Sequence, residues 1–417
     1  MRKKIRIIQL ACFHSNLGDN ANCVGLRRML RKNFPEYELE FTNWELTDYS
    51  WGKTYSQADI DFVNEHDLLI IGGGGFFEIL LDGFQSWTGT RINIPYDLFM
   101  SIKTPTVFYA LGIDAVRGGS EEGVARFGKF LDLMNASPRH LVSMRMDGSR
   151  ETVRGLLGDA QADALTIIPD AGFFTEAKDF LHPEIPEGKK VVTVNLGGDL
   201  LSVRFQDQER PPATLPPPEL IGRPGVRPKD YENLLGDDNK GFMKFMEDLS
   251  DLFVDLLARC PDLHLVFVPH IYRDILMGYK LFSHMGFPYC RRHVTMAPFL
   301  CGDEGQDYIF DLYRKSELVV GMRFHANVSP IGLTTPTVGL GTWHMLEEMY
   351  REIGAHDRVV DCNDRDFLSK AHQLIWSSLD DQDAVRRRYA GIRAELAAKT
   401  DAFHAQIRDL MSRNGVL

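Results

Sequence analysis

Short apolar runs separated by helical patterns recur along the whole chain. In the first half they lie in IRIIQLACF, YELEFTNW, DLLIIGG, TPTVFYALGID, LVSMRM and LTIIPD. Several of these runs are continuously apolar, which is typical of parallel strands covered by helices on both faces. Leu26, Met29, Leu30 and Phe34 have the spacing of the buried face of an intervening helix. The pattern therefore predicts a parallel α/β architecture.

The second half repeats this scheme. Its apolar runs lie in KKVVTVNLG, LHLVFVPH, HVTMAPFL, ELVVGMRF, TPTVGLG and RVVDC, and the longest helical stretch is GFMKFMEDLSDLFVDLLARC. A chain of 417 residues is too long for one ordinary hydrophobic core. We therefore expect two Rossmann-like lobes that face each other.

Proline, glycine and charged residues interrupt the pattern at residues 179–190, which places the join there. The predicted lobes are then residues 1–185 and residues 186–417. A proline-rich segment, residues 204–230, has no apolar period and is expected to be a surface loop of the second lobe. The C-terminal run is helical in composition, and we expect it to pack back on the first lobe.

Composition narrows the class of protein. Apolar residues make up 44% and charged residues 25%, which are ordinary globular values. The net charge of −11 gives no general attraction for nucleic acid or an anionic membrane, so an anionic ligand would need placed arginines. The six cysteines have no zinc or redox spacing, and no apolar run is long enough to span a membrane. We expect a cytoplasmic protein with reduced thiols and no metal site.

The segment ELVVGMRFHANVSPIG ends an apolar strand on Arg323, Phe324 and His325. An unpaired buried cation costs several kcal/mol, so a cleft that receives an anion would explain this ending. In extended geometry Arg323 and His325 point to the same side, where arginine can bind an anion and histidine can exchange a proton. The alternative for His325 is a hydrogen-bonded histidine of the core.

A glycine run follows another predicted strand. Gly73, Gly74 and Gly75 permit positive φ and close approach of the backbone, and they leave N–H groups for an anion. The run lacks the Lys-Ser/Thr of a P-loop and the spacing of a dinucleotide site. It can also be a tight turn at a crowded sheet edge.

In SMRMDGSRE, Arg145 stands at a strand end and Ser149 at the start of a helix. A strand-end arginine can bind a phosphate or carboxylate with both arms of its guanidinium. An ion pair with a nearby aspartate, such as Asp170, is the equal alternative.

Two further segments carry polar candidates. In HSNLGDNAN, Gly18 can make a turn, and Asp19 or Asn20 can either cap a helix or face a substrate, where Asp19 would orient a hydroxyl group. TTPTVGLGTWHML leads a strand into Trp343 and His344, an arrangement that suits a sugar face. A core tryptophan is the alternative.

Together the segments NLGDN, DLLIIGGGGFF, SMRMDGS, IIPDAG and ELVVGMRFHANVSPIGLTTPTVGL resemble the polysaccharide pyruvyl transferase family, over about residues 10 to 355. The resemblance implies a two-lobed fold of the glycosyltransferase-B type. It also implies transfer of the enolpyruvyl group of phosphoenolpyruvate to a sugar, which gives a pyruvate ketal and phosphate without a cofactor. The family's Arg-x-His strand end binds phosphoenolpyruvate, and this role falls on Arg323 and His325.

The chain departs from the family pattern at a few positions. Phe324 stands where leucine is more frequent, and Met146 where an aspartate usually follows the arginine that Arg145 matches. His344 and Met345 stand near the place of an expected lysine.

These observations give one expected site. His325 is the candidate acid, with Asp19 or Asp170 as the base. The expected donor-binding residues are Arg323, Arg145, Gly73, Gly74, Gly75 and Ser149. The expected acceptor-binding residues are Asn16, Trp343 and His344. The expected partners are phosphoenolpyruvate and a carbohydrate acceptor, with no nucleic acid; a homo-oligomer is compatible with the sequence.

Two alternatives stay open. One is a nucleotide-sugar-dependent glycosyltransferase of the same two-lobed fold, and the other is a non-catalytic protein of that fold that binds a sugar or an anion. Many such glycosyltransferases carry two glutamates eight positions apart in the second lobe. Glu347, Glu348 and Glu352 do not have this spacing, which counts against the first alternative.

Overall fold

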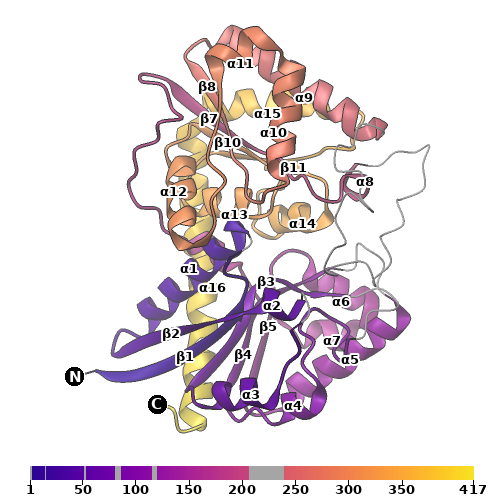
Figure 1. The fold of residues 1–417 in the computed structure, drawn as a ribbon, viewed down its shortest axis with the longest axis vertical. Helices are drawn as coiled ribbons and strands as arrows, with labels where there is room; N and C mark the ends of the chain where they lie inside the picture. The colour runs from indigo at the N-terminus through magenta and orange to yellow at the C-terminus, as the bar shows by residue number, and fades with distance from the viewer. Residues whose placement is uncertain (1, 15, 51–52, 80–85, 115–119, 206–238) are drawn as a thin grey trace.

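The chain forms two six-stranded sheets, one after the other along the sequence, in the residues that the structure describes (Figure 1). The structure is a computed structural model that describes residues 2–14, 16–50, 53–79, 86–114, 120–205 and 239–417. Every strand pair is parallel, and helices flank both sheets. The predicted α/β fold of two Rossmann-like lobes is confirmed.

Every strand predicted from an apolar run is present. The first sheet has the order β2-β1-β3-β4-β5-β6. Its strands are β1 (Lys3–Ala11), β2 (Tyr37–Glu45), β3 (Leu68–Glu78), β4 (Thr106–Asp114), β5 (His140–Arg145) and β6 (Thr166–Ile168). The second sheet has the order β12-β11-β10-β7-β8-β9. Its strands are β7 (Lys190–Asn195), β8 (Leu263–Phe267), β9 (Val294–Met296), β10 (Leu318–Gly321), β11 (Thr337–Gly341) and β12 (Val359–Asp361).

The helices connect the strands and cover the sheets. Those that follow strands of the first sheet are α1 (Leu17–Asn33), α2 (Leu46–Ser50), α3 (Gln57–Asn64), α4 (Tyr96–Met100), α5 (Glu121–Ala136), α6 (Ser149–Leu157), α7 (Asp159–Asp163) and the 3₁₀ helix η1 (Ala171–Phe174). Those of the second half are α8 (Leu201–Arg204), α9 (Lys240–Arg259), α10 (Asp274–Met285), α11 (Phe287–His293), α12 (Gly302–Arg314), α13 (His325–Gly332), α14 (His344–Glu352), η4 (His356–Arg358), α15 (Phe367–Asp380) and α16 (Gln382–Arg413).

The last helix joins the two lobes. Its N-terminal half packs Tyr389 and Leu396 beside Tyr350 of the second lobe. Its C-terminal half packs Phe403 and Ile407 into the core of the first sheet, so α16 extends from the second lobe along the first lobe (Figure 1). The chain passes from the first sheet to the second between β6 and β7. Of the proline-rich segment 204–230, residues 206–230 lie outside the described residues.

Helix α1 brings the two lobes into contact at its first turns. Leu17 and Ala21 belong to an apolar cluster of the second lobe. At Gly25 the helix lies so close to η1 that an added Cβ would stand 1.9 Å from the carbonyl oxygen of Ala171. Residues at the start of α1 are therefore held against the second lobe by packing.

Two expectations about the chain as a whole can be compared with the structure. All six cysteines are free, as expected for reduced thiols. No helix in the described ranges is both long and apolar enough to cross a membrane.

Candidate active site

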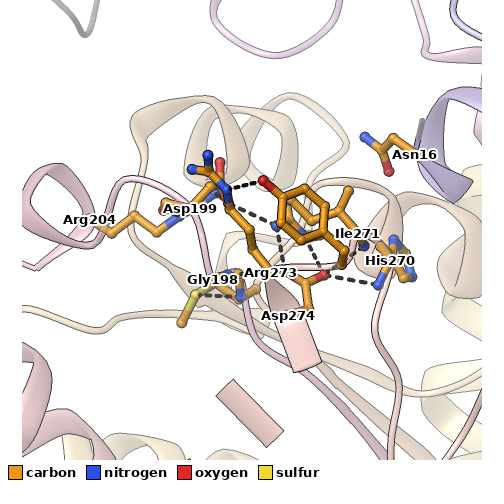
Figure 2. Close-up of polar contacts among 12 residues, drawn as sticks. Asn16, Gly198, Asp199, Arg204, His270, Ile271, Arg273 and Asp274 are labelled. Carbon is orange, nitrogen blue, oxygen red and sulfur yellow. Dashed lines mark hydrogen bonds and ion pairs between the residues drawn. The ribbon is translucent and has the colours of Figure 1, made fainter. Parts of the chain in front are cut away.

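A pocket of about 140 Å³ lies between the lobes, at the carboxyl ends of strands of the second sheet. This is the edge at which open α/β sheets bind their ligands. Four residues expected from the sequence line the pocket, namely Asn16, Arg323, His325 and Trp343. Asn16 comes from the first lobe and faces the polar residues of the second lobe, among them Asp199, Arg204 and His270 (Figure 2).

The expected extended geometry of Arg323 and His325 is wrong. Strand β10 ends at Gly321, Arg323 lies in a bend, and His325 is already the first residue of α13. The backbone turns here because the residues after Phe324 are buried as a helix that packs against η1 and α1. The two side chains still line one pocket, but they bind different partners.

His325 reaches across to the first lobe. Its Nε2–H donates to Oδ1 of Asp170 at 3.2 Å, and the same oxygen accepts from the backbone N–H of Gly172 at 2.7 Å. Nη1 of Arg145 donates to the other oxygen at 3.3 Å. Burial alone would raise the pKa of Asp170, but His325, Arg145 and the Gly172 N–H together lower it to about 2. Asp170 is therefore a fixed carboxylate that orients His325.

Arg145 is part of this buried network, as the ion-pair alternative predicted. It is 4% exposed, its Nε donates to Asp147 at 2.6 Å, and its guanidinium lies over the ring of Phe324, 4.2 Å from the centroid. The family pattern has its aspartate at the position of Met146. In this chain the aspartate that binds the arginine, Asp147, stands one position later. Ser149 donates to Asp147 and accepts from the backbone N–H of Ile113, so its hydroxyl group is already engaged.

Asp19 lies in the first turn of α1, beside His325. Asn16, not Asp19 or Asn20, caps this helix: its Oδ1 accepts from the N–H of Gly18 at 3.0 Å. A Cβ at Gly18 would stand 2.4 Å from Nδ1 of His325, so only glycine lets the helix approach the imidazole this closely. The carboxylate of Asp19 has no hydrogen-bond partner within the described residues.

The surroundings of Asp19 make it easy to protonate. Burial raises its pKa from 3.8 to about 6, although the positive charges of His325 and Arg145 act in the opposite direction. A carboxyl group with a pKa near 6 can give or take a proton at neutral pH, which is the property expected of a general acid or base.

Arg323 binds two carboxylates of the second lobe. Its Nε donates to Oδ2 of Asp274 at 2.7 Å and its Nη2 donates to Oδ1 of the same residue at 2.5 Å, a two-armed ion pair. Nη2 also donates to Asp199 at 2.8 Å. Asp274 is fully buried and accepts backbone N–H groups of Gly198 and His270 as well (Figure 2). The edge of the Arg323 guanidinium that carries Nε and Nη2 is thus held in place by Asp274.

Asp199 bridges two arginines at the pocket. Nη2 of Arg204 donates to its Oδ1 at 3.0 Å, the oxygen that Arg323 also binds. Although burial would raise the pKa of Asp199, the two guanidinium groups hold it well below its usual range. The side chain of Asp199 is 21% exposed, so this carboxylate is the accessible end of the cluster.

Of the two residues Trp343 and His344, which are expected to bind the acceptor, only Trp343 lines the pocket. Trp343 lines the pocket with its ring under Arg204, 4.1 Å from the guanidinium carbon, and its buried Nε1–H has no partner among the described residues. His344 is exposed on the first turn of α14. His270 also lines the pocket, and its Nε2 forms a 2.7 Å hydrogen bond with the hydroxyl group of Tyr313.

The glycine run is not a loop after a strand, because β3 continues to Glu78 with an irregularity after Gly74. Gly73 and Gly74 have φ of 102° and 156°. A Cβ at Gly73 would stand 2.8 Å from Oδ1 of Asn22, and one at Gly74 would stand 3.4 Å from Oδ1 of Asp19. The glycines thus admit α1 and its Asp19 to the sheet, and the run does not line the pocket of Arg323 and His325.

Sequence reasoning did not find Asp199, Arg204, Asp274 and His270. Gly197, Gly198 and Asp199 directly follow the first strand of the second half, and His270 follows the next strand along the chain. The same strand-end rule that selected Arg323 could have selected Asp199 and His270. Nothing local in the sequence pairs Arg323 with Asp274.

The fold and the site define a two-lobed α/β protein of glycosyltransferase-B type with an ionisable site between its lobes. A family model for polysaccharide pyruvyl transferase matches residues 16–344. The chain belongs to the polysaccharide pyruvyl transferase family, and it is a transferase on that ground. A search among curated proteins finds no match to this sequence.

Solved structures share the fold at low sequence identity. A structure from Listeria monocytogenes, assigned as a UDP-N-acetylglucosamine 2-epimerase, has a TM-score of 0.51 at 13% identity and covers 95% of this chain and 94% of that chain. The α,α-trehalose-phosphate synthase (UDP-forming) from Burkholderia vietnamiensis has a TM-score of 0.48 at 10% identity and covers 100% of this chain and 99% of that chain. The likeness to the first of these shows the fold and nothing about the substrate.

Proposed function

We propose that this protein transfers the pyruvyl group of phosphoenolpyruvate to two hydroxyl groups of a carbohydrate, forming a pyruvate ketal and releasing phosphate. The observation that carries the proposal is a pocket lined by Arg204, Arg323 and His325. Arg204 and Arg323 share one accessible carboxylate, and His325 stands beside Asp19, whose pKa of about 6 suits proton transfer.

The arginine pair is suited to the anionic donor. Asp199 is a carboxylate held between two guanidinium groups, so it occupies the position that a carboxylate or phosphate of the donor would take. In our proposal the donor displaces Asp199 and binds Arg204 and Arg323. The Arg323 nitrogens bound to Asp274 keep the guanidinium oriented while this exchange occurs.

The proton-transfer pair is suited to an enol ether. An acid adds a proton to the methylene carbon, C2 becomes electrophilic, and a sugar hydroxyl group adds there. The C2–O bond to phosphate then breaks, and a second hydroxyl group closes the ketal. Of the two hydroxyl protons, one is balanced by the new methyl hydrogen and the other leaves with phosphate.

The structure refines the roles expected for three residues. His325 remains our candidate acid, because its Nε2 is fixed by Asp170 and its Nδ1 has no partner within the described part of the chain. Asp19 is our candidate base, since its carboxylate is unbonded there and its pKa is raised to about 6. Asp170 positions His325, because its oxygens are taken and its pKa of about 2 makes it a poor base.

The experiment follows phosphate release from phosphoenolpyruvate with a panel of hexosides, together with the mass of each glycoside. We expect phosphate release that depends on the acceptor, and a glycoside that gains the mass of a pyruvyl group. Phosphate release that is the same with and without every acceptor would contradict the proposal.

A further inference from the structure

Two buried ring nitrogens belong to residues of the pocket between the lobes and have no hydrogen-bond partner in the described residues. They are Nδ1 of His270 and Nε1 of Trp343, and both residues line the pocket together with Arg204 and Arg323. His270 is 1% exposed. Buried polar atoms are almost always hydrogen-bonded, so these two nitrogens indicate a ligand of the pocket.

The hydrogen bond between His270 and Tyr313 decides which ring nitrogen of His270 carries the proton. The hydroxyl group of Tyr313 is fully buried, and within the described part of the chain its partner is Nε2 of His270, at 2.7 Å. A buried phenol needs an acceptor for its proton, so its O–H donates to Nε2. Burial and the positive charges of Arg323 and His325 hold the pKa of His270 well below its usual range, so the ring is neutral. The proton of the neutral ring is therefore on Nδ1, which is a hydrogen-bond donor.

His270 is also fixed relative to Arg323. Its backbone N–H donates to Oδ2 of the buried Asp274 at 2.9 Å (Figure 2). The same oxygen accepts from Nε of Arg323 at 2.7 Å. One carboxylate thus holds both residues, so their donor groups keep a constant arrangement in the pocket.

Trp343 lies beside the second arginine of the pocket. The guanidinium carbon of Arg204 lies over the ring of Trp343, 4.1 Å from its centroid. The guanidinium group therefore covers one face of the indole, and that face is closed to a sugar. This arrangement favours a role for the indole N–H over the stacking on a sugar that the sequence suggested.

An unpartnered histidine nitrogen does not by itself indicate a ligand. His264 is 2% exposed, its Nε2 is hydrogen-bonded to the hydroxyl group of Thr295, and its Nδ1 is unpartnered as well. His264 does not line this pocket, whereas His270 lines it together with two arginines and an indole. A set of charged and neutral N–H donors suits an oxyanion, because the oxygens of an oxyanion only accept hydrogen bonds.

We propose that Nδ1–H of His270 and Nε1–H of Trp343 donate to the oxyanion that Arg204 and Arg323 bind in this pocket. The pocket volume of about 140 Å³ is below the roughly 300 to 1,000 Å³ of pockets for drug-sized ligands, which favours a small anion over a nucleotide sugar. The choice of phosphoenolpyruvate as the ligand rests on the proposed function. The two N–H groups then bind either its phosphate or its carboxylate, and free phosphate and pyruvate distinguish these two cases.

The test is calorimetric titration of the purified chain with phosphoenolpyruvate, inorganic phosphate and pyruvate, each without acceptor. Trp343→Phe keeps an aromatic ring under Arg204 but removes the N–H, and His270→Leu removes the imidazole. Each variant should bind phosphoenolpyruvate about tenfold or more weakly, as expected for the loss of a hydrogen bond to a charged group. His270→Asn puts an amide N–H near the place of Nδ1, and its affinity should stay within about threefold of the parent. Weaker phosphate binding assigns the N–H groups to the phosphate, and weaker pyruvate binding assigns them to the carboxylate.

Two matched controls lie outside the pocket. His264→Leu removes a buried histidine that also has an unpartnered Nδ1. Trp376→Phe removes an indole N–H that donates to His372 at 3.0 Å, from a ring whose centroid lies 5.8 Å from the guanidinium carbon of Arg259. Both controls should bind phosphoenolpyruvate like the parent.

Three results would overturn the inference. They are a parent chain that binds none of the three anions, unchanged phosphoenolpyruvate binding in Trp343→Phe and His270→Leu, and an equal loss of binding in the controls. Where His270→Leu fails to fold, proton NMR decides: the indole N–H signal that Trp343→Phe removes should shift when phosphoenolpyruvate is added to the parent, and a signal that stays in place would overturn the inference. A chain that binds phosphoenolpyruvate through these groups but transfers nothing would contradict the proposed function alone.

Discussion

The carboxylate of Asp19 is held in surroundings that disfavour its charge, so Asp19→Asn is expected to stabilise the protein at neutral pH while it lowers turnover. The folded pKa of about 6 stands above the ordinary 3.8. One pKa unit corresponds to about 1.4 kcal/mol, so ionising Asp19 in the folded state costs about 3 kcal/mol at most. The carboxylate keeps partial contact with water, which makes this an upper value.

The sign of the pH dependence follows from the raised pKa. Below the pKa that Asp19 has in the unfolded chain, its carboxyl group is protonated in both the folded and the unfolded state and does not change the free energy of unfolding. As pH rises through the folded pKa, the parent loses stability that the asparagine variant does not lose. The full difference in the free energy of unfolding between Asp19→Asn and the parent is about 3 kcal/mol, and about 1.4 kcal/mol of it should develop between about pH 5 and about pH 8.

The assay is urea unfolding of both proteins at several pH values, followed by circular dichroism. Asp132 is an exposed carboxylate on α5 with no contact to the site, so Asp132→Asn serves as the matched control and should show no such pH dependence. A stability difference between Asp19→Asn and the parent that stays constant from about pH 5 to about pH 8 would refute a raised pKa. Full turnover in Asp19→Asn would refute its role as the base.

Four further substitutions test the site. Arg323→Lys loses the two-armed pair with the buried Asp274, and should weaken both folding and donor binding by about 1.5 to 3 kcal/mol in urea unfolding and calorimetry. His325→Asn should lower turnover by about 10²-fold with little change in donor affinity. Gly18→Ala pushes a methyl group to within 2.4 to 2.8 Å of Nδ1, Cγ and Cβ of the buried His325, and should lower both the melting temperature and turnover, the latter by about 10²-fold in the fraction that stays folded. Asp199→Asn removes the carboxylate that competes with the donor, and should tighten donor binding by about 1 kcal/mol, or about fivefold; weaker binding would contradict the proposed displacement.

The fold followed from the sequence because buried parallel strands must be apolar, and each apolar run of the chain became a strand. The strand-end rule also placed Arg323 and His325 in one pocket. The rule failed on the local geometry of Arg323 and His325. The alternation of apolar and polar side chains at Met322, Arg323 and Phe324 predicts that the strand continues. The turn into α13 comes instead from packing against η1 and α1, which lie far away in the sequence.

The electrostatic partners could not be predicted for a similar reason. Arg323 binds Asp274 and Asp199, which are 49 and 124 positions away. No local period or spacing links residues so distant, and only the order of strands in the second sheet brings them together. The same holds for His325 and Asp170, which lie 155 positions apart and on different lobes.

The central claim is that a proton is added to the methylene carbon of phosphoenolpyruvate before a sugar hydroxyl group adds at C2. The most direct measurement is mass spectrometry and proton NMR of the product formed in D₂O with an accepting glycoside. We predict a pyruvate ketal whose methyl group carries one deuterium from solvent, with phosphate released in equal amount. A ketal methyl group free of deuterium would contradict the account, as would a glycoside left unchanged while phosphate is released.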